Sequence, residues 1–183
     1  MIVGVVVLLI LVLLILFIVT QYNSLVRLRN ETQNSWAQVD VVLRRRYDLI
    51  PNLVETVKGY ATHESETLEA VIQARSGAID ASAVADQADS ENILSGALRR
   101  LFALSEAYPD LKADSNFMEL QKQLVQTEGQ IAYARANYNE SVLRFNNMVQ
   151  VVPSNIVAGM FSFVVGDFFE IEDEATGPIS VQF

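Results

Sequence analysis

The chain opens with an uninterrupted apolar run. Residues Ile2 to Val19, IVGVVVLLILVLLILFIV, contain no charged side chain. As a helix these 18 residues span about 27 Å, close to the thickness of bilayer hydrocarbon. A signal peptide has a basic start and a small-residue cleavage site, and the chain shows neither. A buried core helix is normally shorter and amphipathic. The pattern therefore predicts an uncleaved single-pass anchor, residues 1–20.

Charges beside the anchor give an orientation. Arg27 and Arg29 lie just after the apolar run, and no Lys or Arg precedes it. The positive-inside rule then places the amino terminus outside the cell (inner) membrane and the body, residues 21–183, in the cytoplasm.

Helical periodicity continues directly into the body. A stripe with spacings of three and four residues follows the anchor, with no Pro or Gly between them. It consists of Leu25, Leu28, Thr32, Trp36, Val39 and Leu43. Anchor and first body helix are therefore expected to be continuous up to about residue 48. A second helix is expected over 49–76, with Asp48 as its N-cap, Pro51 in its first turn and Gly77 at its end.

Two further helices complete the body. Residues 78–92 are rich in Ala, Asp and Ser and predict a loop with a frayed helix start, so the third helix is expected to begin at Ile93. The fourth has the longest stripe, is capped by Ser115 or Asn116 and ends at Pro153. That stripe contains Phe117, Leu120, Leu124, Thr127, Ile131, Ala134, Tyr138, Ser141 or Val142, Phe145 and Met148.

These lengths predict an all-α protein, an antiparallel four-helix bundle that continues from the N-terminal transmembrane helix. The bundle occupies residues 21–153, and an irregular aromatic tail follows over 154–183, with an acidic run and a strand-like end, ISVQF. In a straight first helix, the corner RRRYDLIP lies at the far tip, about 40 Å from the membrane.

Composition excludes several kinds of chemistry. The 183 residues carry a net charge of -9, which argues against nucleic-acid binding. Cysteine is absent, so there is no disulfide framework or thiolate site. The one histidine, His63, precedes Glu64 in HESET, where Thr67 replaces the second histidine of a zincin motif. Neither a metal nor another cofactor is expected.

Enzymatic activity has little support in the sequence. No nucleophile elbow, phosphate-binding loop or dinucleotide motif is present. Glu128 and Glu140 lack the Glu-x-x-His spacing of di-metal bundles and are interpreted as solvated or cap-stabilising carboxylates. The expectation is a protein that is not an enzyme.

Two clusters remain as candidate contacts with another subunit or partner. Arg44, Arg45 and Arg46 end the expected first helix, where cations favour the helix dipole. The second cluster is Phe161, Phe163, Phe168 and Phe169. Three roles stay open for these phenylalanines: capping the open end of the bundle, lying in the membrane interface, or docking into a neighbouring subunit.

The sequence resembles the LemA family over nearly the whole chain. The resemblance rests on the anchor, on RRYDLIPNLVETVKGYA, on the run from AYPDLKADSNFMELQKQLVQTEGQ to NNMVQVVPSNIVAGMF, and on FFEIEDE. It implies an anchored antiparallel helical bundle in a bacterial cell envelope and no known enzymatic activity.

Two functions are consistent with these features. The leading hypothesis is a membrane-anchored, non-enzymatic scaffold that assembles with copies of itself, because unlike surfaces on one protomer favour head-to-tail association. Its expected partners are the lipid bilayer and its own copies, which would meet through coiled-coil contacts. The alternative is an adaptor that binds another membrane protein, such as a protease or a signalling kinase.

Overall fold

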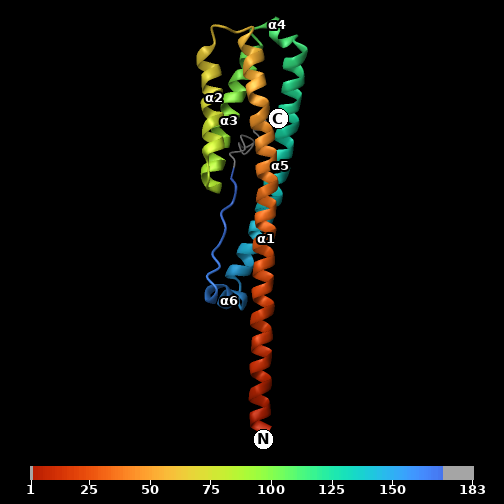
Figure 1. Ribbon diagram of the computed structural model, residues 1–183, viewed down its shortest axis with the longest axis vertical. Helices are drawn as coiled ribbons and strands as arrows, with labels where there is room; N and C mark the ends of the chain where they lie inside the picture. Colours follow the sequence, from red (N-terminus) through yellow and green to blue (C-terminus); the bar gives the residue numbers. More distant parts are fainter. Residues whose placement is uncertain (1, 171–183) are drawn as a thin grey trace, which may run out of the picture. The chain divides into compact units, whose positions relative to one another are not determined.

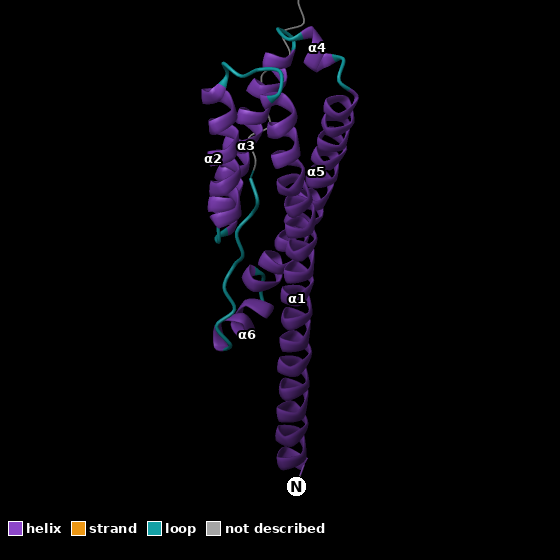
Figure 2. Cartoon of the chain, turned by 45° about the horizontal axis from the view of Figure 1, so that its top comes forward, coloured by secondary structure: helices purple, strands orange, loops and turns teal. Residues whose placement is uncertain are grey.

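Every regular element of the computed structural model, which describes residues 2–170, is a helix (Figures 1 and 2). The predicted all-α fold is confirmed. The helices of this part are α1 Ile2–Lys58, α2 Ser65–Asp80, α3 Val84–Ser105, α4 Pro109–Lys112, α5 Ser115–Gln150 and α6 Ser154–Met160. All but the first residue of the acidic run, Glu170 to Glu174, and the strand-like end lie outside the described residues.

The chain forms two compact units, and α1 and α5 contribute to both. The first unit comprises residues up to Val42 together with Ile131–Phe168. The second comprises Leu43–Gln130 and, at the end of the described chain, Phe169 and Glu170.

The second unit contains the antiparallel four-helix arrangement that the sequence predicts. The end of α1, α2, α3 and the start of α5 are its four long helices, and α4 lies in the connection from α3 to α5 (Figure 1). Arg46 pairs with Glu128, whereas Tyr60, beyond the end of α1, contacts Asp114, just before α5. The two helices therefore run in opposite directions. The largest buried apolar side chains of this unit are Ile50, Leu53, Val57, Leu94, Leu101, Leu111, Phe117 and Phe169.

The first unit pairs α1 with α5 and adds α6. Glu31 forms an ion pair with Arg144, and Trp36 packs on Tyr138 with ring centroids 5.1 Å apart, so the helices are again antiparallel. The predicted stripes on both helices face this contact, with Leu25, Val39, Val142 and Phe145 among the buried side chains.

The amino-terminal part of α1 has the character of a membrane span. It contains an 18-residue window of mean hydropathy 3.8, and none of that window is buried. By length and composition, α1 is the one helix among the described residues that is suited to cross a membrane.

The described part of the tail, residues 154–170, is more regular than the sequence predicts. It begins with α6, and hydrogen bonds to α5 in the first unit fix the extended chain that follows. The side-chain amide of Asn146 donates to the carbonyl of Gly166 at 2.9 Å, and its oxygen accepts from the N–H of Gly166 at 2.8 Å. The Tyr138 hydroxyl donates to the carbonyl of Asp167 at 2.9 Å.

The predicted corner at Asp48 and Pro51 is wrong, because α1 continues to Lys58 with Pro51 inside it. Proline has no N–H for the carbonyl four residues earlier, that of Tyr47. Arg75 of α2 supplies the missing donor, with its Nε 2.7 Å from that carbonyl. The chain turns only after Lys58, in the loop 59–64 that leads to α2 (Figure 2).

The predicted ends of α2 and α3 also need correction. Gly77 does not terminate α2, which ends at Asp80, because burial of Ala78 holds the last turn against the core. The segment expected as a loop is mostly helix, since α3 begins at Val84. The cap of α5 is Asp114, whose Oδ1 accepts from the N–H groups of Asn116 and Phe117 at 2.8 and 2.9 Å.

Candidate functional site

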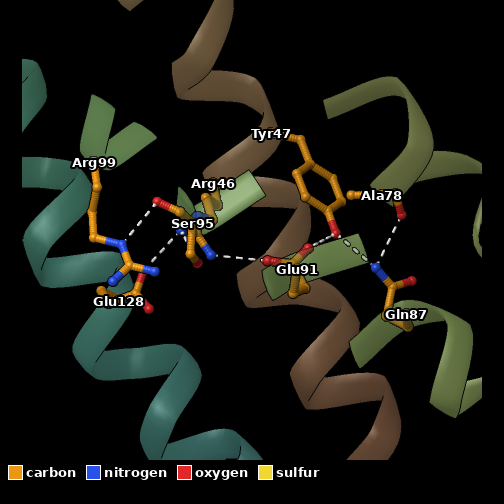
Figure 3. Close-up of polar contacts among 8 residues, drawn as sticks. All are labelled: Arg46, Tyr47, Ala78, Gln87, Glu91, Ser95, Arg99 and Glu128. Carbon is orange, nitrogen blue, oxygen red and sulfur yellow. Dashed lines mark hydrogen bonds and ion pairs between the residues drawn. The ribbon is translucent and has the colours of Figure 1, made fainter. Parts of the chain in front are cut away.

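A buried polar network lies inside the second unit, with side chains from three helices and a backbone contact to a fourth, α2 (Figure 3). Its central residue is Glu91 of α3, a side chain with no exposed surface. The other side chains come from α1, α3 and α5. They are Arg46, Tyr47, Gln87, Ser95 and Glu128. An ionised carboxylate in an apolar core is costly unless it is paired and hydrogen-bonded, so every partner matters here.

Glu91 uses both carboxylate oxygens. Its Oε2 accepts from Nη1 of Arg46 at 2.9 Å, and its Oε1 accepts from the hydroxyl of Tyr47. Arg46 in turn extends the network, with Nη2 at 2.9 Å from the Ser95 hydroxyl and 3.0 Å from Oε2 of Glu128. Two carboxylates therefore flank one buried guanidinium, and Glu128 reaches solvent.

The second branch of the network runs through Gln87. Its side-chain N–H group donates to the Tyr47 hydroxyl and to the carbonyl of Ala78, both at 2.9 Å. Ala78 lies near the end of α2, so Gln87 ties α2 to α1 and α3 (Figure 3). Because Glu91 and Gln87 are one turn apart on α3, their side chains share the face toward α1.

Burial and charge set the proton affinities of the network. Burial raises the pKa of Glu91, while the hydrogen bond from Tyr47 and the charge of Arg46 oppose that shift. Burial and the neighbouring Glu91 carboxylate raise the pKa of the Tyr47 hydroxyl far above its ordinary value. Tyr47 therefore remains a hydrogen-bond donor across the physiological pH range.

The geometry of the network is that of a structural site, which holds the helices in place. Each carboxylate oxygen of Glu91 has a donor, and a closed arrangement of this kind favours one register of the helices over others. No group of three or more His, Cys, Asp or Glu residues suited to hold a metal occurs within residues 2–170. His63 lies exposed in the loop before α2.

An open depression in the second unit carries two further carboxylates. It is lined by Asn52, Glu55, Thr56, Asn116, Glu119 and Leu120. Glu55 lies one turn from Lys58, and Glu119 accepts a hydrogen bond from Gln123 of its own helix. Both carboxylates thus have local helix partners, as is usual on a solvated surface.

The three predicted arginines do not act as one cluster. Arg44 and Arg45 are exposed on α1, whereas Arg46 is 3 % exposed and bound to Glu91. Successive residues on a helix point about 100° apart, which separates Arg46 from its neighbours. The predicted role of Arg46 in contacts with a partner is therefore corrected to a contact inside the protomer. All three arginines lie within α1 rather than at its end.

The four phenylalanines also separate. Phe169 is fully buried, which corrects its predicted role as a surface contact. Phe163 packs edge-on against Phe145 of α5, with ring centroids 6.4 Å apart, while Phe161 and Phe168 keep 48 % and 38 % of their surface exposed.

Sequence reasoning missed Glu91, Gln87 and Tyr47. A signal was present, because the stripe of Leu94 and Leu98 extends backward by three and seven residues to the positions of Glu91 and Gln87. Polar side chains at core positions of a helix indicate a buried hydrogen-bond network, although the composition of this segment by itself predicts a loop.

The chain combines an apolar helix of bilayer length with a helical bundle whose buried charges, Arg46 and Glu91, are paired with each other. These features define a class of membrane-associated helical proteins. Within that class the chain belongs to the LemA family, whose model matches residues 35–183. The resemblance seen in the sequence is confirmed.

Curated relatives include two kinds of protein. Protein LemA of Metamycoplasma hominis is 29 % identical over 140 residues, which cover 74 % of this chain and 63 % of the relative. Magnetosome protein MamQ 2 of Paramagnetospirillum magneticum is 24 % identical over 87 % of this chain and 68 % of its own length. Magnetosome protein MamQ of Magnetospirillum gryphiswaldense is 23 % identical over the same shares. None of these three names denotes an enzymatic activity.

Proposed function

We propose that the chain is a membrane-anchored, non-enzymatic scaffold that assembles with copies of itself through the outer faces of the second unit. The observation that carries this proposal is a pair of isoleucines on α2. Ile72 and Ile79 are 50 % and 48 % exposed. They are seven residues apart and so lie on one face of the helix, as the apolar positions of a helix–helix contact do.

A second outer face supports the same proposal. On α5, Met118 and Val125 are also seven residues apart, and they are 51 % and 66 % exposed. The two faces differ in side-chain shape and belong to different helices. Unlike surfaces on one protomer favour heterologous contacts, which give rings or open assemblies rather than a simple two-fold dimer.

The buried network suits a scaffold because it fixes the helices that carry these faces. Arg46 and Glu91 join α1 to α3, and Gln87 joins α3 to α2. Buried ionic groups add little net stability, and their best-attested use is to specify register. A fixed register keeps Ile72 and Ile79 in one position for a partner.

The size of the full-length protein in mild detergent tests assembly directly. Light scattering after gel filtration is expected to give several copies per particle. The variant Ile72→Glu with Ile79→Glu is expected to reduce that number, whereas Gln73→Glu, on an adjacent face of the same helix, leaves it unchanged. A monomer at every concentration contradicts the proposal. A stoichiometric foreign protein in the purified particle, without self-association, favours an adaptor that binds another membrane protein.

The location of the body is a separate part of the proposal. The apolar start of α1 crosses the membrane, and the body lies in the cytoplasm because Arg27 and Arg29 follow the span. Protease added to spheroplasts is expected to leave the body intact until the membrane is permeabilised. Digestion of the body in intact spheroplasts contradicts this orientation.

A further inference from the structure

In the first unit, α6 is held against the end of the apolar segment of α1. Val157 and Ala158 of α6 are 1 % exposed and form a core cluster with Leu25 and Phe145. The partly buried side chains packed on this cluster include Phe17 and Ile18, which belong to the apolar segment itself. The short helix therefore lies at the level along α1 where the membrane span ends.

The opposite face of α6 is apolar and is left exposed by the described residues, 2–170. Ile156 and Met160, one turn apart, are each 62 % exposed. The residues on both sides continue this surface, with Val151, Val152, Phe161, Val164 and Val165 all exposed. No charged side chain occurs in the sequence between Arg144 and Asp167. An uncharged apolar surface of this kind is unusual for a protein face in water.

Aromatic side chains connect this surface to the anchor. Tyr22, three residues beyond Val19, packs against Phe161 with ring centroids 4.7 Å apart and against Phe163 at 5.9 Å. The guanidinium carbon of Arg29 lies 5.2 Å from the centre of the Phe163 ring. A tyrosine next to an apolar span, followed by an arginine, is the order found where hydrocarbon gives way to headgroups.

We propose that α6 and the residues flanking it lie in the boundary between lipid headgroups and acyl chains, beside the anchor. This proposal rests on the membrane anchoring in the proposed function. The occupant of the exposed face is lipid because Phe17, Ile18 and Tyr22 hold α6 at the end of a segment that bilayer lipid surrounds. Amphipathic helices at this depth bury one apolar face and keep their polar side toward water. Here the inner side packs on α1 and α5.

This second lipid contact restrains the anchor. A single span alone is free to tilt and to rotate about its axis, because length does not fix either. With α6 in the interface, the rotation of α1 is set by the direction in which Ile156 and Met160 point. The first unit then meets the membrane in one orientation.

The absence of cysteine makes a site-specific test straightforward. Single cysteines at Ile156 and at Met160 of the full chain are labelled with an environment-sensitive fluorophore. The protein is reconstituted in vesicles of phosphatidylcholine and phosphatidylglycerol that contain nitroxide-labelled lipid. With the nitroxide near the headgroup, both probes are expected to emit in the blue and to lose about half of their emission, as for a helix 5–10 Å deep.

Two further probes make the outcomes distinct. Leu11→Cys lies near the middle of the apolar segment and reports the anchor, with the nitroxide placed on the acyl chain for this probe. Leu143→Cys is the matched control, because Leu143 is 50 % exposed and apolar, as Leu11 is. It adjoins Arg144, which pairs with Glu31. Glu31 is 12 residues (31 minus 19) past Val19, or about 18 Å beyond the span along α1.

Quenching at Ile156, Met160 and Leu11, but not at Leu143, is the expected result. Quenching at Leu11 alone overturns the interfacial position of α6 and leaves membrane anchoring intact. Loss of quenching at Leu11 as well overturns both. Blue-shifted emission at Ile156 and Met160 without lipid quenching overturns the proposal in favour of a protein partner, such as a second copy of the chain.

Discussion

Glu91 of the second unit and Phe145 of the first are both buried against α1, but their surroundings are chemically opposite. Glu91 is enclosed by a guanidinium, a phenol and the amide that binds this phenol. Phe145 is enclosed by Leu25, other aliphatic side chains and the ring of Phe163. A hydrogen-bond network requires one alignment of its helices, whereas an apolar cluster tolerates volume-conserving repacking. The second unit therefore specifies one register of its helices by directed hydrogen bonds, whereas the first is held by apolar packing.

Removing the carboxylate of Glu91 is expected to have the largest effect. Glu91→Ala leaves Arg46 buried without its main counter-charge, which typically costs about 3–5 kcal/mol. Denaturant unfolding of the detergent-solubilised protein measures the loss, and hydrogen exchange is expected to rise in α2 and α3. The control is Arg45→Ala, an exposed neighbour. The double variant Arg46→Met with Glu91→Leu removes both charges and should be less destabilised than Glu91→Ala. If Glu91→Ala and the double variant lost the same free energy of unfolding, the unpaired charge of Arg46 would not be the cause of the destabilisation.

The corresponding change in the first unit is Trp36→Ala. Trp36 is partly buried and packs on Tyr138, so the expected loss is about 2 kcal/mol, below the usual 3–5 kcal/mol for a fully buried aromatic ring. Val41→Ala, at a 67 % exposed position of α1, serves as the control. Exchange is expected to rise along α1 and α5 near the ring pair. Faster exchange in α2 and α3 instead would mean that the two cores respond as one.

A backbone contact of the second unit gives the next effect. Arg75→Met removes the donor to the Tyr47 carbonyl that Pro51 leaves open, at an expected cost of about 1.5 kcal/mol. Pro51→Ala returns the N–H to the helix. In that background Arg75→Met should cost measurably less, and a double-mutant cycle on unfolding free energies gives the coupling. Identical costs in both backgrounds would show that Arg75 acts only by packing.

This contact also explains what the sequence could not predict. Proline and the preceding Asp48 are local signals for a helix start, and they pointed to one here. Arg75 lies more than 20 residues away and overrides them. A hydrogen-bond donor contributed from another helix leaves no pattern in the local sequence. The position of the turn therefore could not be predicted from the residues around Pro51.

The stripes of α1 and α5 were predictable for the opposite reason. Leu25, Val39, Ile131 and Phe145 recur at helical spacing, and each is buried. In α3 the same periodicity is carried by Gln87 and Glu91, which match a loop by composition and a core by spacing. The candidate site was therefore missed where polar side chains occupy core positions.

The turn after α6, in the first unit, contains a residue with a strained backbone conformation. Ser162 has φ 56°, in the left-handed region, while the N–H groups of Ser162 and Phe163 bond back to the carbonyls of Gly159 and Ala158. This Schellman arrangement favours glycine at the position of Ser162. Ser162→Gly is expected to stabilise the protein by about 1 kcal/mol, whereas Ser162→Ala is not. Thermal unfolding distinguishes the two, and equal midpoints would contradict a strained turn.

The smallest effect at neutral pH is expected at the cap of α5 in the second unit. The N–H of Phe117 and the hydroxyl of Tyr60 hold the pKa of Asp114 below its ordinary value. Asp114 therefore contributes stability above its unfolded pKa, and this contribution disappears as the pH falls through its folded pKa. Asp114→Asn keeps a good cap and removes the titration. Its unfolding free energy should match the parent protein at neutral pH and depend less on pH in acid.

The contribution of Glu91 to the pH dependence of stability has the opposite sign to that of Asp114, so the two can be distinguished. Because its folded pKa is raised, folding takes up a proton there, and stability decreases as the pH rises from the unfolded toward the folded pKa. Unfolding of Asp114→Asn across acidic pH exposes this term, since the competing contribution from Asp114 is gone. Asp89→Asn, at an exposed position of α3, is the control. An unchanged acid slope in Asp114→Asn would mean that the cap of α5 does not titrate with folding.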